Sequence, residues 1–271
     1  MRPVDIRTAQ MDWLYTLSGF IVGTIVGFTG VGGGSLMTPL LVLLFGVHPS
    51  TAVGTDLLYA AVTKSGGTLV HARQGQVRWD IVGRLAVGSI PATALTLIIL
   101  AQLPKQGPAA AHLISIGLGL ALLGTAAAIL LRKRIQALGQ KHSHPEGGPA
   151  TPRHLTAITV AVGALLGVLV SLSSVGAGAL GTAALFFLYP RLPTQQIVGS
   201  DVAHAVPLTL VAGIGHWFIG SVDFHLLGTL LLGSLPGIWI GSTLSARVPE
   251  RVLRPLLAGT LVLVGTKLIA A

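Results

Sequence analysis

Long apolar runs dominate this chain and leave few folds open to it. Only 9% of the 271 residues are charged, against about 25% in soluble domains. The runs approach or reach the ~20 residues that a helix needs to cross a bilayer; they are residues 13–28, 52–70, 81–101, 109–131, 155–172, 202–219, 224–244 and 252–271. The sequence therefore predicts an all-α polytopic protein of a cytoplasmic membrane, with lipid as a partner.

Charge and cysteine content exclude several classes of function. The net charge of +9 comes from basic residues in short loops between apolar runs, where such residues set membrane orientation. We therefore expect no nucleic-acid partner. Without cysteine there is no disulfide, thiolate metal site or cysteine nucleophile. We expect no catalytic residue, no metal and no cofactor, and the sequence has no phosphate-binding loop of an ATP-driven pump.

The chain contains an internal repeat. Residues 53–56 read Val-Gly-Thr-Asp, and residues 198–201 read Val-Gly-Ser-Asp. In the same register His71, Gly88, Ser89 and Pro91 match His216, Gly233, Ser234 and Pro236. Upstream, in a register one residue shorter, residues 31–38 match residues 175–182. We predict a first membrane repeat over residues 1–131, a polar cytoplasmic linker over 132–153, and a second membrane repeat over 154–271.

The segment 13–46 decides whether the repeats are parallel or inverted. It is too long for one ordinary span, and its centre, residues 30–35, is rich in glycine, which costs roughly 1 kcal/mol per residue inside a helix. If the chain enters and returns here, residues 35–46 form a short helix and each repeat has about five helical segments. Then 12 of the 17 Lys and Arg lie on one side, which is cytoplasmic by the positive-inside rule. The sequence thus favours two inverted repeats, with short broken helices at glycine-rich loops.

The two glycine-rich loops, residues 30–35 and 173–178, are candidates for an anion site. Each would precede the N-terminus of a short helix, where unpaired N–H groups and a partial positive charge attract anions. Glycine lets an anion approach the backbone closely. The candidate substrate ligands are Gly30, Gly32, Gly33, Gly34, Ser35, Ser173, Ser174, Gly176 and Gly178. The alternative is that these glycines only permit close helix packing.

The same residues resemble a known family. Residues 27–40 (Gly-Phe-Thr-Gly-Val-Gly-Gly-Gly-Ser-Leu-Met-Thr-Pro-Leu) and 52–57 (Ala-Val-Gly-Thr-Asp-Leu) resemble the TauE/SafE family of sulfite exporters and related permeases. The resemblance covers essentially the whole chain, including the second copy at residues 171–178. It implies transport of sulfite, an organosulfonate or a related sulfur-containing or carboxylate anion. Ala177 replaces Gly33 in the second copy, so the loops need not be equivalent.

Four ionisable residues within or beside the apolar runs are further candidates. Asp56 and Asp201 occupy matching positions, and an acid inside a membrane is usually functional. Either could carry a proton during transport, or be stabilised by a nearby helix N-terminus. His204 follows Asp201 on the same helix face and is its candidate partner. Lys64, in mid-segment, either offers its charge to the anion or extends to the membrane surface.

These observations favour a secondary transporter that moves a small anion by alternating access and is coupled to protons. A passive anion channel would use the same loops. An intramembrane enzyme is a third reading, but the motifs around Ser35 and the two acids are not those of such enzymes. The sequence leaves open which anion is moved, in which direction, with which coupling ion, and whether the protein is a homodimer.

Overall fold

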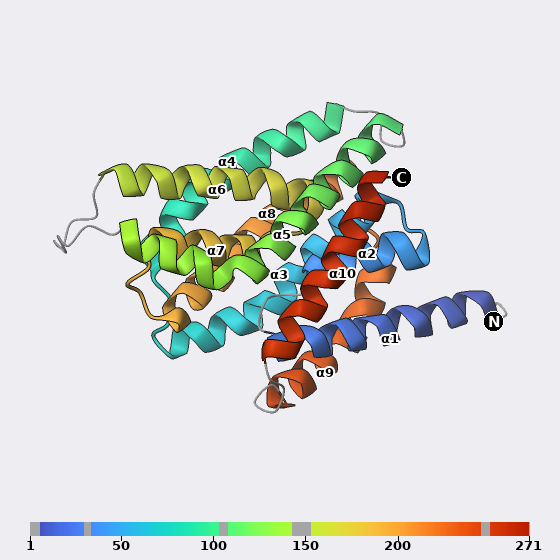
Figure 1. Ribbon diagram of the computed structural model, residues 1–271. Helices are drawn as coiled ribbons and strands as arrows, with labels where there is room; N and C mark the ends of the chain where they lie inside the picture. The colour runs from blue at the N-terminus through green and yellow to red at the C-terminus, as the bar shows by residue number, and fades with distance from the viewer. Residues whose placement is uncertain (1–5, 30–33, 103–107, 143–152, 245–249, 271) are drawn as a thin grey trace.

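The computed structural model describes residues 6–29, 34–102, 108–142, 153–244 and 250–270. Within these ranges all regular structure is helical (Figure 1). The helices are α1 (Ile6–Thr29), α2 (Gly34–Phe45), α3 (Pro49–Arg73), α4 (Trp79–Gln102), α5 (Pro108–His142), α6 (Arg153–Ser173), α7 (Ala179–Leu188), α8 (Thr194–Ile219), α9 (Phe224–Leu244) and α10 (Glu250–Ala270). By length and composition, α4, α6, α8, α9 and the Ser115–Arg132 part of α5 are suited to cross a membrane. The predicted all-α polytopic fold is confirmed.

Two helices are too short to span a bilayer. Helix α2 has 12 residues and α7 has 10, which correspond to about 18 and 15 Å at ~1.5 Å per residue. The hydrocarbon core is about 30 Å thick. Helix α6 ends at Ser173 and α7 begins at Ala179, so residues 174–178 interrupt the helical path. The predicted broken helices are confirmed, although the first break, at residues 30–33, lies outside the described residues.

The most extensive helix contacts join one half of the chain to the other. Helix α1 packs against α9, and α6 packs against α4. In the register of the repeat α1 corresponds to α6 and α9 to α4, so these two pairs are equivalent. Helices α3 and α8, which correspond to each other, also pack together, as do α5 and α10. In Figure 1 the α1–α9 pair lies below the central α3–α8 pair, and the α4–α6 pair lies above it.

Glycine allows α1 and α9 to approach closely. A Cβ atom at Gly23 would lie 2.5 Å from the Ser234 carbonyl oxygen, and one at Gly19 would overlap with the Leu230 carbonyl oxygen. On the opposing helix, a Cβ at Gly233 would overlap with the Thr16 carbonyl oxygen. Small residues at helix crossings are typical of membrane proteins, because lipid gives helices little hydrophobic reason to associate and close packing must hold them.

The α4–α6 crossing repeats these contacts residue by residue. Gly163 and Gly167 lie against the backbone of Leu85 and Ser89, and Gly88 lies against that of Val160. Each position matches its counterpart at the α1–α9 crossing in the registers found from the sequence. The two halves of the chain are therefore packed on each other in an equivalent way.

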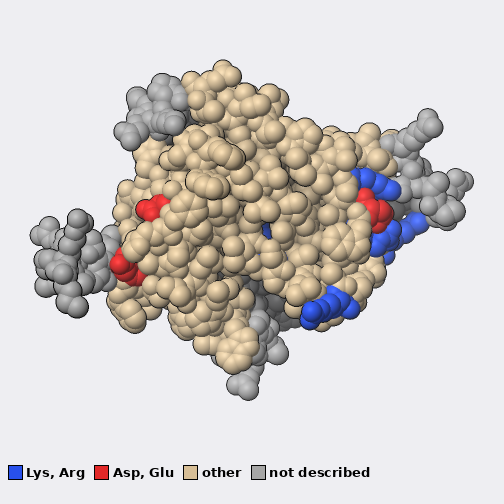
Figure 2. All heavy atoms as spheres, turned by 180° about the vertical axis from the view of Figure 1, so that it is seen from behind, with Lys and Arg blue, Asp and Glu red and all other residues tan. Residues whose placement is uncertain are grey.

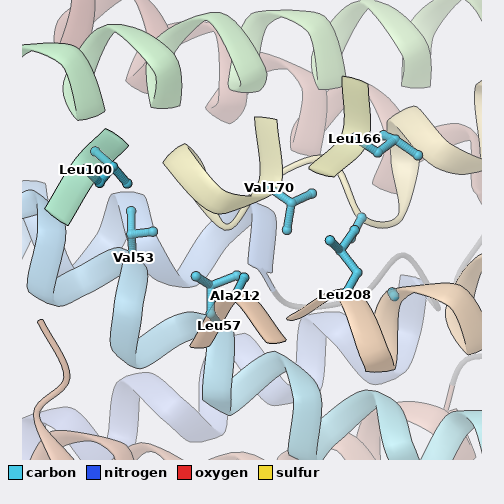
Figure 3. Packing of buried hydrophobic residues seen from close by; sticks show 9 residues of the cluster. Val53, Leu57, Leu100, Leu166, Val170, Leu208 and Ala212 are labelled. Carbon is cyan, nitrogen blue, oxygen red and sulfur yellow. The ribbon is translucent and has the colours of Figure 1, made fainter. Parts of the chain in front are cut away.

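An apolar cluster fills the centre between α3, α4, α6 and α8. Figure 3 shows side chains from α3, α6 and α8 directed toward one another. The cluster comprises Val53, Leu57, Leu100, Leu166, Val170, Ala177, Ala205, Leu208 and Ala212, all buried. Leu57 and Ala205 directly follow Asp56 and His204 in sequence, so the cluster borders the polar residues of the molecular interior.

Charged residues occupy the two ends of the molecule. The face in Figure 2 shows Lys and Arg gathered at one end together with an acidic side chain, two acidic patches toward the other end, and a band between them that is almost free of charge. Arg73, Arg78 and Arg191 are exposed near the α3–α4 and α7–α8 connections, and Asp223 is exposed just before α9. Exposed Lys267, in the last turn of α10, is an exception. The separation agrees with the predicted orientation, which stays a prediction, as do the boundaries of the repeats and linker.

Candidate functional site

Asp56 lies deep in the interior, seven residues after the start of α3. Its side chain is fully buried. The Thr38 hydroxyl group of α2 donates a hydrogen bond to Oδ2 at 2.5 Å, and Oδ1 has no partner among the described residues. Ser174, in the break between α6 and α7, lies close to the same carboxyl group. Asp56 thus connects one short helix to the break that precedes the other.

Asp201 lies at the matching position of α8, seven residues after the start of that helix, but its surroundings differ from those of Asp56. It is buried, and within the described part of the chain neither carboxyl oxygen has a hydrogen-bond partner. Its Oδ1 lies against Gly181 of α7, where a Cβ atom would overlap with it. Thr182, which corresponds to Thr38, donates instead to the Gly178 carbonyl oxygen at 2.5 Å. The duplicated acids are therefore not equivalent in the structure.

Lys64 is buried and points toward the break between α6 and α7. Its Nζ donates to the Ala177 carbonyl oxygen, and its ammonium group interacts electrostatically with Asp201 and Asp56. Its counterpart in α8 is Thr209, whose hydroxyl donates within its own helix to Ala205. Of the two alternatives from the sequence, the inward position is the one observed.

His204 is buried but does not form the expected pair with Asp201. Its Nε2 lies 2.9 Å from the Ser89 hydroxyl of α4, and its Nδ1 has no partner among the described residues. The difference arises because α4 packs against α8 and brings a hydroxyl group to the imidazole. A spacing along one helix cannot reveal a competing partner on another.

The break at residues 174–178 has an unusual backbone. Gly176 and Gly178 have φ of 113° and 153°, and Ser174 has φ of 56°, a region that residues other than glycine rarely adopt. Such conformations cluster at functional sites. The Ser173 hydroxyl group is used locally, donating to Leu169 and accepting from the Val175 N–H. The Ser174 hydroxyl group is buried without a partner among the described residues, so it is the better placed of the two serines to bind a ligand.

The ligands proposed in the first glycine-rich loop are only partly visible. Gly30, Gly32 and Gly33 lie outside the described residues. Gly34 is the first residue of α2, and Ser35 follows it in that helix. The assignment of these five residues to an anion site stays a prediction.

Taken together, the interior holds several polar groups around Lys64 that have no hydrogen-bond partner among the described residues. They are Asp56 Oδ1, both Asp201 oxygens, Ser174 Oγ and His204 Nδ1. A buried polar group without a partner costs roughly 1–3 kcal/mol, and such groups often mark bound water or ions. Among the described residues no group of three or more His, Cys, Asp or Glu could hold a metal ion. The arrangement is suited to a small polar or ionic ligand.

Comparison with known proteins decides the family. The model of the sulfite exporter TauE/SafE family matches residues 15–268. The chain belongs to the TauE/SafE family. It is 40% identical over 254 residues to the probable membrane transporter protein YjnA of Bacillus subtilis, covering 93% of this chain and 98% of that protein. It is also 30% identical over 260 residues to YdhB of the same organism, another probable membrane transporter protein. No solved structure matches the chain significantly.

The family confirms the resemblance seen in the motifs. This TauE/SafE protein is a multi-pass membrane transporter and not an enzyme. Sequence reasoning missed three groups around the site: the hydroxyl groups of Thr38 and Ser89, and the Ala177 carbonyl group. The matches of Thr38 with Thr182 and of Ser89 with Ser234 were visible in the repeat. They did not reveal which carboxyl or imidazole group each hydroxyl contacts.

Proposed function

We propose that this TauE/SafE protein is a secondary transporter that moves a small anion across the cytoplasmic membrane, coupled to protons and by alternating access between two inverted halves. The anion is sulfite, an organosulfonate or a related sulfur-containing or carboxylate anion. The observation that carries the proposal is the buried Lys64 ammonium group. It donates to the backbone between two broken helices and lies among polar groups that have no partner in the described parts of the chain.

The anion binds where Lys64 meets the break at residues 174–178. Its negative charge replaces the Ala177 carbonyl group as the partner of the ammonium group, and the Ser174 hydroxyl donates to it. Helix α7 begins at Ala179, so the partial positive charge of its N-terminus lies at the same break. These groups substitute for the hydration shell of a small oxyanion.

A proton on one carboxyl group makes anion binding compatible with the two acids. Asp56, Asp201 and the anion share one ammonium group, so an ionised carboxylate repels the incoming anion. Uptake of a proton removes this repulsion and carries the proton along with the anion. Asp201 is the stronger candidate for this role, since Asp56 already accepts a hydrogen bond from Thr38 whereas neither Asp201 oxygen has a partner among the described residues.

The equivalent α1–α9 and α4–α6 crossings support movement between two related halves. Transporters with repeated halves commonly bind substrate between them at broken helices and move one part against the other. A channel needs no such movement. An exchange assay distinguishes a carrier from a channel. Anion on the opposite side of the membrane accelerates the efflux of internal anion through a carrier but not through a channel.

The test of the site is anion binding and flux in purified Lys64→Gln. Lys64→Gln removes the charge but keeps a polar chain, and we expect at least about a tenfold loss of affinity, which corresponds to ~1.4 kcal/mol. Binding is measured as the anion-induced rise in thermal stability, with sulfite and a sulfonate as probes. Lys267→Gln, at an exposed position, is the control. Normal affinity and flux in Lys64→Gln would place the anion elsewhere.

Proton coupling is tested with Asp56→Asn and Asp201→Asn in proteoliposomes. The amide keeps the shape and hydrogen-bonding capacity of the side chain but cannot titrate. We expect both variants to bind anion and to lose acceleration by an imposed pH gradient, with the larger loss in Asp201→Asn. If both retain the wild-type response to the gradient, the acids do not couple transport to protons.

A further inference from the structure

The duplicated Gly-Thr-Asp and Gly-Ser-Asp triplets make matching contacts with the opposite half of the chain. The Asp223 N–H donates to Thr55 Oγ1 at 3.1 Å. The Arg78 N–H donates to Ser200 Oγ at 2.9 Å. In the register of the repeat Thr55 corresponds to Ser200, and Arg78 to Asp223. Each hydroxyl group thus binds the backbone immediately before a helix of the other half, α9 or α4.

The preceding glycines reinforce both contacts. A Cβ atom at Gly54 would overlap with the Ser221 carbonyl oxygen, and one at Gly199 would overlap with the Gln76 carbonyl oxygen. Ser221 and Gln76 again correspond in the repeat. Each triplet therefore provides a glycine that lets a turn approach, a hydroxyl group that binds this turn, and a carboxyl group in the buried site.

The two contacts lie at opposite ends of the molecule. Residues 220–223 connect α8 to α9, at the end where Asp223 is exposed, and residues 74–78 connect α3 to α4, at the end where Arg73 and Arg78 are exposed. Helices α3 and α8 run antiparallel between these ends, since the start of each contacts the turn that follows the other.

Both contacts are formed in this structure, and the two acids are closed off from solvent. Asp56 is 0% exposed and Asp201 is 1% exposed. Thr55 directly precedes Asp56 in α3, and Ser200 directly precedes Asp201 in α8. A shift of either hydroxyl group therefore also shifts the neighbouring carboxyl group. The separation of a turn from its triplet would open a path to the acid nearest that end.

We propose that Thr55 and Ser200 are positioning residues that latch the site shut at opposite ends, Thr55 at the end of Asp223 and Ser200 at the end of Arg78. The inference rests on the proposed transport function for the role of the enclosed site. Transport by alternating access requires that one latch opens while the other stays closed. A substitution that removes one hydroxyl group then favours opening at one end only.

The test measures access at each end in the absence of anion. The chain has no cysteine, so single cysteines report cleanly. Ala52 and Ile197 are both buried, with exposed fractions of 0% and 1%. They correspond to each other in the repeat, and each lies three residues before the latch residue of its helix. Ala52→Cys and Ile197→Cys are labelled with a membrane-impermeant maleimide in vesicles of both orientations.

We expect opposite effects from the two latch substitutions. Thr55→Ala raises the labelling rate at position 52 and not at position 197, whereas Ser200→Ala does the reverse. One neutral hydrogen bond contributes about 0.5–1.5 kcal/mol, so the expected increase is about 2- to 12-fold. Thr55→Ser and Ser200→Thr keep the hydroxyl group and should restore the wild-type rates.

The control is Thr63→Ala, which removes a hydroxyl group that donates within α3 to Tyr59 at 2.9 Å; neither reporter should change. Thr55→Val, which keeps the side-chain shape, is the second variant if Thr55→Ala folds poorly. Equal changes at both reporters, or none, would overturn the proposal. The labelling assay needs no anion, so it is independent of the transport assay. If the protein moves none of the tested anions but still shows one-sided labelling effects, the proposed function is rejected and the proposed latches are supported.

Discussion

Thr38→Val isolates the contact between the short helix α2 and the acid of α3. The substitution keeps the branched shape but removes the hydroxyl group that donates to Asp56 Oδ2 at 2.5 Å. Thr38 and Asp56 are both fully buried, so solvent does not supply a replacement. Because Oδ1 already lacks a hydrogen-bond partner in the described structure, the substitution leaves this buried carboxyl group without its short hydrogen bond from α2. The expected loss of unfolding free energy is about 1–3 kcal/mol.

Thr182→Val is the matched control from the second repeat. Its hydroxyl group donates to the Gly178 carbonyl oxygen, which also accepts the Thr182 backbone N–H at 2.9 Å. That carbonyl group keeps a partner after the substitution, so we expect a loss of no more than about 1 kcal/mol. For a chain of this size ~1 kcal/mol shifts the melting temperature by about 2–4 °C, so Thr38→Val should melt several degrees below Thr182→Val.

Thermal unfolding in detergent, followed by tryptophan fluorescence, measures the difference. The same pair of substitutions is then made in Asp56→Asn, where the effect of Thr38→Val should change because the two side chains are in contact. Equal melting temperatures for the two valine variants would refute the reasoning. So would an effect of Thr38→Val that is the same with and without Asp56→Asn.

Two further predictions concern glycine, and one concerns orientation. Gly181→Ala should lower stability by about 1–3 kcal/mol and weaken anion binding, because the added Cβ overlaps with Asp201 Oδ1. Its control is Gly228→Ala, where the added Cβ meets open space, and this variant should melt at or above the wild-type temperature. In Gly88→Ala and Gly233→Ala the added Cβ atoms overlap with equivalent backbone atoms at the two helix crossings, so both variants should lower the melting temperature by similar amounts. A lower melting temperature in only one of them would contradict the equivalence of the crossings. A reporter fused after Ala271 should be active only outside the cytoplasm, and cytoplasmic activity would reject the inverted topology.

Much of the fold follows from local chemistry that the sequence displays directly. Apolar runs of bilayer length predict helices, and a glycine-rich stretch followed by a short apolar run predicted α2 and α7 as short helices. The repeated triplet placed Asp56 and Asp201 at the same depth in α3 and α8. The helix inferences depend only on residues close together in the chain, and the placement of the two acids depends only on a comparison of two short segments.

The partners of the site residues could not be predicted in this way. Lys64 has no local signal that selects the Ala177 carbonyl group, more than a hundred residues away. His204 has Asp201 at helical spacing but bonds to Ser89 of α4 instead. The asymmetry between Asp56 and Asp201 arises from opposing helices, where Thr38 faces one acid and Gly181 faces the other. Duplication predicts similar surroundings, and only the packed structure reveals that they differ.

The equivalent helix crossings also have a consequence for how the chain matures. Proteins are synthesised from the N-terminus, and segments generally fold as they emerge. Helix α1 packs on α9 rather than within its own half, so its glycine face has no native partner until more than two hundred residues have followed it. The first half must wait in the membrane with its contact surfaces uncovered. Its insertion is therefore separate from its folding, and the two halves complete each other only at the end of synthesis.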